Sequence, residues 1–194
     1  MEKREPAPLP SIDQSWTLFL DRDGVINVHR PNDYVKTWDE FEFLPGSPEA
    51  LATLSKMFGR IILATNQRGV GRSLMTKETL DIIHARMLHE VRAKGGDIHG
   101  MYAATELEEH DTGQRRKPGI GMALDAKEDY PDIDFARSFK VGDGVRDIHF
   151  GQALGMRTVL LQKGGVSATD TSLCPDYVFD SLAAFARAVA RRNY

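Results

Sequence analysis

The chain has 194 residues, of which 41% are hydrophobic and 27% charged, and its formal net charge is −3 at pH 7. This composition is ordinary for a water-soluble globular protein, and it excludes the global basic field that attracts nucleic acid. The single cysteine, Cys174, excludes an internal disulfide and a multi-cysteine metal site. The apolar runs are far too short to span a bilayer, so we expect a cytoplasmic protein without a membrane partner.

The sequence predicts a leader followed by one domain. Residues 1–14 are predicted to be disordered or extended, because Met1–Pro10 carries both charge signs and three prolines but no apolar stretch. In residues 15–194, short apolar runs alternate with amphipathic stretches of helical length. The runs, predicted as strands covered on both faces, are Thr17–Leu20, Arg60–Ala64, Gly100–Ala104, Ser138–Val141, Thr158–Leu161 and Tyr177–Phe179. The predicted helices are Pro48–Met57, Lys77–Lys94, Ile120–Glu128, Val145–Leu154 and Leu182–Arg191.

This alternation predicts an α/β fold with a doubly wound, mostly parallel sheet. One stretch breaks the pattern, at about residues 28–45, where Tyr34-Val35 and Phe41–Leu44 are two short β-like runs. We predict a short β-hairpin flap here, lying over the strand ends. No gap between the motifs is long enough for a separate cap domain, so we expect an open active site.

Two acidic pairs follow predicted strands, where an open parallel sheet binds its ligands. Asp21 and Asp23 follow the first strand, and such carboxylates can act as a nucleophile and as a general acid and base. Asp143 and Asp147 follow a later strand, and hard carboxylate oxygens suit Mg²⁺. Taken singly, each pair is also compatible with an ordinary Asp-Gly turn.

Three further polar groups are predicted at the same edge of the sheet. Thr65 and Asn66 follow the second strand, where a hydroxyl and exposed N–H groups can hold phosphate oxygens. Pro118 suits the first turn of the next helix, which places Lys117 at its N-terminus, a favourable place for an anion. Taken singly, these residues are also typical of turns and of a solvated basic cluster.

The ordered set of motifs resembles the haloacid dehalogenase superfamily of phosphatases, whose four motifs match Asp21 with Asp23, Thr65, Lys117, and Asp143 with Asp147. The resemblance extends from Trp16 to about Phe179. The runs FLDRDGVIN, ATNQRGVGR, RRKPG and VGDGVRD are similar to the small capless branch, which contains heptose bisphosphate phosphatases and histidinol-phosphate phosphatases.

The resemblance implies a role for each site residue. Asp21 attacks phosphorus to form an aspartyl-phosphate, and Asp23 protonates the leaving oxygen and then activates water. Asp21, the backbone carbonyl of Asp23 and Asp143 hold Mg²⁺, with Asp147 supporting the waters of the metal or Lys117. The residues expected to bind phosphate or the rest of the substrate are Thr65, Asn66, Lys117, Arg116 and Asn27. Phosphoryl transfer depends mainly on positioning and charge neutralisation, in agreement with these roles.

The resemblance also predicts the substrate class, a small phosphorylated metabolite. D-glycero-D-manno-heptose 1,7-bisphosphate is favoured, hydrolysed at the 7-phosphate, and histidinol phosphate is the alternative. A nucleic-acid 3′-phosphatase and a catalytically silent phospholigand-binding protein are less favoured. The chain departs from both capless families in the loop 103–115, which lacks their zinc-binding cysteines, so we predict no structural zinc. Gly144 stands where heptose phosphatases tend to carry a lysine. A monomer is the default expectation.

Overall fold

The computed structural model describes residues 8–112, 114–162 and 174–193. Its centre is a six-stranded sheet of order β3-β2-β1-β4-β5-β6, in which every pairing is parallel. The strands are β1 (Thr17–Leu20), β2 (Arg60–Asn66), β3 (Gly100–Ala104), β4 (Ser138–Gly142), β5 (Arg157–Leu161) and β6 (Tyr177–Phe179). All six strands lie where the apolar runs predict them, so the predicted α/β fold is confirmed.

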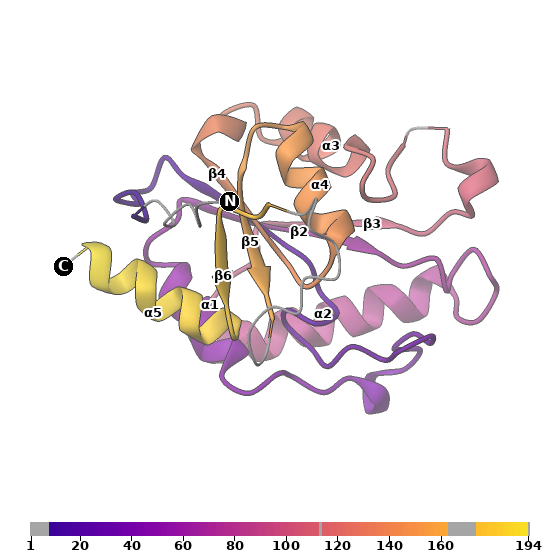
Figure 1. Cartoon of the computed structure of the whole chain (residues 1–194). Coiled ribbons are helices and arrows are strands. Elements are labelled where there is room, and N and C mark those ends of the chain that lie inside the picture. Colours follow the sequence, from indigo (N-terminus) through magenta and orange to yellow (C-terminus); the bar gives the residue numbers. More distant parts are fainter. Residues whose placement is uncertain (1–7, 113, 163–173, 194) are drawn as a thin grey trace.

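Five α-helices cover the sheet, α1, α2 and α5 on one face and α3 and α4 on the other (Figure 1). Their bounds are α1 (Ser47–Leu54), α2 (Lys77–Ala93), α3 (Gly121–Asp129), α4 (Val145–Ala153) and α5 (Leu182–Asn193). The two faces form separate apolar cores because side chains alternate along a strand. In β1, Leu18 and Leu20 enter the core under α1 and α5, whereas Phe19 enters the core under α3 and α4. Burial on both faces explains the continuous apolar runs of the sequence.

Helix α2 begins and ends close to its predicted bounds. The hydroxyl of Thr76 accepts a hydrogen bond of 3.1 Å from the backbone N–H of Thr79, which caps the helix as its residue type predicts. The buried face of α2 consists of Leu80, Ile83, His84, Met87 and Val91. None of the described helices is long and apolar enough to cross a lipid bilayer.

The flap differs from the predicted β-hairpin. Residues 28–45, all of which the structure describes, hold one 3₁₀ helix (Trp38–Glu40) and a single bridge from Phe43 to Asn27, but no strand. Trp38 and Phe41 stack with ring centroids 4.9 Å apart, and Phe43 meets Phe41 edge-on at 5.0 Å. The 3₁₀ turn brings these two rings, three residues apart, to the same side of the chain and interrupts the alternation that a strand needs. The hairpin prediction is therefore wrong, and aromatic packing against the core anchors the flap.

The predicted leader is only partly described. Residues 1–7 lie outside the described residues. Leu9 and Ile12 pack against the core under α5, and the guanidinium of Arg192 donates a hydrogen bond of 3.0 Å to the carbonyl of Leu9. Between and after the strands, the described segments hold the five α-helices, three short 3₁₀ helices and their connecting loops, which is consistent with the predicted lack of a cap.

Candidate active site

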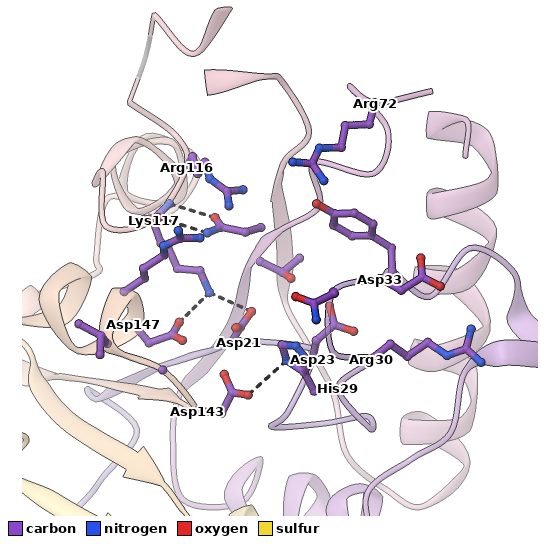
Figure 2. Close-up of a pocket in the computed structure, with 17 residues that line it drawn as sticks. Asp21, Asp23, His29, Arg30, Asp33, Arg72, Arg116, Lys117, Asp143 and Asp147 are labelled. Carbon is purple, nitrogen blue, oxygen red and sulfur yellow. Dashed lines mark hydrogen bonds and ion pairs between the residues drawn. The ribbon is translucent and has the colours of Figure 1, made fainter. Parts of the chain in front are cut away.

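A cavity of about 620 Å³ lies at the carboxyl ends of β1, β2 and β4. Strand β1 lies between β2 and β4, so the chain departs from it in two directions, and such a switch point is where open α/β sheets bind ligands. In Figure 2, Lys117 lies with Asp21, Asp143 and Asp147 toward one end of this cavity, and Arg72 and Arg116 lie toward the other. The predicted site residues that line it are Asp21, Asp23, Thr65, Asn66, Arg116, Lys117, Asp143 and Asp147.

The two acidic loops contact each other directly. Asp21 follows β1, and its backbone N–H donates to the carbonyl of Val141 in β4 at 3.0 Å. Gly24 has φ +81°, and a Cβ atom there would lie 1.9 Å from Oδ2 of Asp143. Only glycine allows this left-handed turn and this close approach together. The Asp-Gly turn after β1 therefore brings the first acidic pair into contact with Asp143.

Three carboxylates form a cluster that fits a divalent cation. Asp21, Asp143 and Asp147 each offer an oxygen, and these oxygens lie within 4.8 Å of one another. Burial, followed by the charges of Asp21 and Asp147, raises the pKa of Asp143 to about 6. Burial also raises the pKa of Asp21, and the neighbouring Asp147 adds to this effect. The raised pKa values show that the negative charge at Asp21 and Asp143 is incompletely neutralised, and hard oxygen donors of this kind suit Mg²⁺.

Stability without a divalent cation is expected to depend on the protonation of Asp143. Its pKa is raised in the folded state, so its stabilisation is complete below about pH 4 and is lost as the pH rises through about 6. We expect a loss of roughly 2 kcal/mol in the free energy of unfolding, measured by urea denaturation in a chelator. Saturating Mg²⁺ should remove this loss. Asp143→Asn serves as the reference, and an identical pH dependence in that variant would contradict the assignment.

Lys117 is buried and bridges two of the carboxylates. Its Nζ lies 2.8 Å from Oδ1 of Asp21 and 2.6 Å from Oδ1 of Asp147 (Figure 2). Burial by itself lowers the pKa of Lys117, but the charges of Asp147 and Asp21 outweigh burial and raise this pKa above its usual value. Asn66 fixes the lysine backbone, accepting from its N–H at 2.9 Å and donating to its carbonyl at 3.2 Å. The ammonium is therefore charged and held at the nucleophile.

The helix predicted at Ile120–Glu128 forms, but the prediction that Pro118 lies in its first turn is wrong. Helix α3 begins at Gly121, and Lys117 and Pro118 lie in the preceding turn. The N–H of Gly119 donates to the carbonyl of Arg116 at 2.8 Å, and the N–H of Gly121 reaches back to Gln114 at 3.0 Å. These turn hydrogen bonds replace the helical pattern, so the ion pairs and Asn66, and not a helix N-terminus, position Lys117.

A buried network holds Asp23. Arg22 donates to both of its carboxylate oxygens at 3.1 and 3.0 Å, Asn27 donates to Oδ1 at 2.9 Å, and Gln67 donates to Oδ2 at 2.7 Å. Burial alone would raise the pKa of Asp23, but Arg22 and these donors hold it below its usual value. Behind them, Nη1 of Arg22 lies 3.3 Å from Nε2 of His84 in α2. Burial and then Arg22 lower the pKa of His84 to about 3, so the ring is neutral and accepts.

One predicted site residue lies outside the cavity, and several residues of the site were not predicted. Asn27 is fully buried and does not line the cavity, and its amide donates to Oδ1 of Asp23, so the structure places it behind that carboxylate. The sequence alone did not identify the residues that support Asp23, which are Arg22, Gln67 and His84. The one sequence signal for them is a polar residue at a position expected to be buried. The cavity is also lined by residues that the motifs did not identify, including His29, Tyr34, Arg72 and Arg146.

The comparisons with known proteins agree with this site. Residues 114–185 match the model of the HAD-hydrolase-like family. A D-glycero-α-D-manno-heptose-1,7-bisphosphate 7-phosphatase of Mycobacterium bovis is 38% identical over 180 residues, which cover 90% of this chain and 91% of that protein. A D-glycero-β-D-manno-heptose-1,7-bisphosphate 7-phosphatase of Pseudomonas aeruginosa is 36% identical over 174 residues, 89% of this chain and 96% of that protein.

Solved structures with a similar fold include proteins of the same kind. The crystal structure of a D,D-heptose 1,7-bisphosphate phosphatase from B. bronchiseptica, complexed with magnesium and phosphate, has a TM-score of 0.78 to this chain. The identity is 31%, and the match covers 91% of this chain and 99% of that one. The chain therefore belongs to the HAD-like hydrolases, as a phosphatase of the family that these relatives represent.

Proposed function

We propose that this phosphatase hydrolyses the 7-phosphate of D-glycero-D-manno-heptose 1,7-bisphosphate with Mg²⁺ as its cofactor. The observation that carries the chemistry is Asp21 at the end of β1, 2.8 Å from the Lys117 ammonium and clustered with Asp143 and Asp147. The proposed substrate rests on the similarity to heptose bisphosphatases along about nine tenths of the chain.

The reaction divides into two displacements. A carboxylate oxygen of Asp21 attacks phosphorus, the bond from phosphorus to the sugar oxygen breaks, and Asp23 gives its proton to that oxygen. Water then attacks the aspartyl-phosphate, Asp23 takes the water's proton, and phosphate leaves with Asp21 restored. The donors around Asp23 keep it ionised in the free protein, which is the form that the second displacement needs. For the first displacement Asp23 must take up a proton from solvent when the substrate binds, and it passes this proton to the leaving oxygen.

Charge neutralisation is divided among the remaining groups. When bound at Asp21, Asp143 and the backbone carbonyl of Asp23, Mg²⁺ supplies Lewis-acid stabilisation of the phosphoryl oxygens. Lys117 and the Thr65 hydroxyl bind the transferring phosphoryl group, with Asn66 holding Lys117 in place. Asp147 supports Lys117 and the waters of the metal.

The second phosphate of the substrate is assigned to the arginine end of the cavity. Arg116 lines it together with Arg72 and Arg146, and a guanidinium fork suits a phosphate dianion. We expect Arg116→Ala to lower kcat/KM for the bisphosphate about tenfold or more, with little effect on a monophosphate. Steady-state kinetics on both substrates test this.

Arg115→Ala is the matched control for Arg116→Ala. The Arg115 guanidinium pairs with Asp125 at 2.7 Å and lies outside the main cavity, so its loss should leave kcat/KM nearly unchanged. Equal losses in both variants would show a general effect of loop charge and contradict a specific subsite.

Substrate identity is tested directly by kcat/KM with Mg²⁺ for the two anomers of the heptose bisphosphate, the heptose 1-phosphate and histidinol phosphate. A preference of about a hundredfold for a bisphosphate anomer is expected. A preference for histidinol phosphate would overturn the heptose assignment while leaving the phosphatase chemistry intact. Both anomers are included because the two relatives act on different ones.

We further propose that residues 15–194 work as a single phosphatase domain with residues 28–45 as its flap, following a leader of residues 1–14. A monomeric state and a cytoplasmic location complete the proposal. The exposed free thiol of Cys174 suits a reducing compartment. Size-exclusion chromatography with light scattering tests the monomer, and a dimeric mass would contradict it.

A further inference from the structure

A second buried lysine lies under the acidic cluster and has no part in the proposed reaction. Lys140 belongs to β4 and is 0% exposed, and its register partner in β1 is the core residue Phe19. Its Nζ lies 3.0 Å from Oδ1 of Asp147 and 5.5 Å from the centre of the Phe150 ring. A fully buried strand thus carries an ammonium into the core directly beneath the carboxylate cluster.

Lys140 and Lys117 share one oxygen of Asp147. Both ammonium groups contact Oδ1, at 3.0 and 2.6 Å, whereas Oδ2 lies on the side of Gly142. A Cβ atom at Gly142 would lie 2.2 Å from Cγ of Asp147, so the backbone there is shaped to accept this carboxylate. Asp147 is therefore clamped through Oδ1, and its second oxygen is left for the cation or its waters.

The stability of the fold does not explain Lys140. A buried ion pair is often no more stabilising than a well-packed apolar side chain, because desolvating the two charges offsets their attraction. Methionine has a similar length and would lie against Phe150 without that cost. The structure therefore points to a task at the site, carried out through Asp147.

The charge of Lys140 has two opposite consequences. It repels a divalent cation that binds to the same carboxylate cluster, so it weakens the affinity for the metal. It also neutralises Asp147 when Lys117 turns toward the transferring phosphoryl group, so that Lys117 does not leave a buried carboxylate unpaired. The first effect concerns metal binding alone, and the second rests on the proposed function.

We propose that Lys140 is a positioning residue that holds Asp147 for the phosphoryl-transfer step and lowers the affinity of the acidic cluster for its divalent cation. The loss of its charge then changes two measurable quantities in opposite senses. Metal binding tightens, because a repelling charge is gone. Turnover slows, because Lys117 alone must neutralise Asp147.

The test compares the wild type with Lys140→Met, Lys140→Gln and Phe150→Leu. Isothermal titration calorimetry with Mg²⁺ measures the metal Kd, and turnover of a generic aryl phosphate measures kcat and KM. For Lys140→Met we expect a Kd about tenfold lower and a kcat about tenfold lower, with an unchanged or higher Tm. Lys140→Gln removes the charge but keeps a donor toward Asp147, so its Kd should fall equally and its kcat should fall less.

Phe150→Leu separates positioning from general damage, because it loosens the same part of the core and keeps the ion pair. We expect it to lower Tm and to leave the Mg²⁺ Kd unchanged. Weaker or unchanged Mg²⁺ binding in both Lys140 variants would overturn the proposal. Calorimetry does not depend on the sugar substrate, so failure of the heptose assignment would be seen separately, in the substrate comparison.

Discussion

Asp21→Asn is expected to lower turnover by at least about a thousandfold, because an amide cannot form the aspartyl-phosphate. The fold should survive. The variant loses the ion pair with Lys117, but it also removes the repulsion between Asp21 and Asp147 that contributes to the raised pKa of Asp21. These effects oppose each other, so the free energy of unfolding should stay within about 1 kcal/mol of the wild type. Phosphate release and urea denaturation measure the two quantities.

Asp33→Asn is the matched control for Asp21→Asn. Asp33 lines the same cavity, but its carboxylate is 45% exposed and pairs with Lys36 on the flap. Its loss should change kcat/KM by less than about threefold, because exposed ion pairs contribute little. Residual Mg²⁺-dependent turnover in Asp21→Asn above a few per cent of the wild type would contradict the nucleophile assignment.

Lys117→Met is expected to damage both activity and stability, unlike Asp21→Asn. The substitution removes the ammonium that contacts Asp21 and Asp147, and within the described part of the chain it leaves Lys140, paired with Asp147, as the neighbouring lysine. Breaking a buried pair from one side costs about 3–5 kcal/mol in the free energy of unfolding. Turnover should fall by at least about a thousandfold, because the transferring phosphoryl group loses its cation.

The loss of unfolding free energy in Lys117→Met should depend on Mg²⁺. Saturating Mg²⁺ should restore part of the lost unfolding free energy of Lys117→Met, because a divalent cation neutralises the same carboxylates. Lys94→Met is the control, since Lys94 forms an exposed pair with Glu49 and should cost less than about 1 kcal/mol. A Lys117→Met protein as stable as the control in a chelator would show that the two ion pairs do not hold the site together.

The network behind Asp23 shows why sequence reasoning found the reacting groups more easily than their supports. Asp23 lies three residues after the end of β1, and this position alone predicts that it belongs to a site. His84 lies 62 residues from Arg22 along the chain, yet their side chains meet at 3.3 Å. The periodicity of α2 indicates that position 84 faces inward, but not which group lies opposite. That contact depends on how α2 packs over the first acidic loop.

The flap is the clearest case in which local pattern misled. Tyr34-Val35 and Phe41–Leu44 have β-type composition, and their residue types alone favour a hairpin. The energy of burying Trp38, Phe41 and Phe43 together is larger than such a local preference, so the segment forms a 3₁₀ turn and an irregular path. Intrinsic β-propensity is too weak to set the secondary structure of a segment whose side chains pack against the core. The flap therefore forms a wall of the cavity that contains no strand.

The sequence by itself determined the sheet, the helices and the acidic, hydroxyl and lysine groups of the site. This was possible because parallel strands bury continuous apolar runs and bring their carboxyl ends to one edge, so that order along the chain becomes proximity in space. The tertiary structure alone decided the partners: Lys117 between Asp21 and Asp147, Lys140 beneath Asp147, and arginines from separate loops around one cavity. Periodicity reports which way a side chain faces, whereas its partner depends on how distant elements pack.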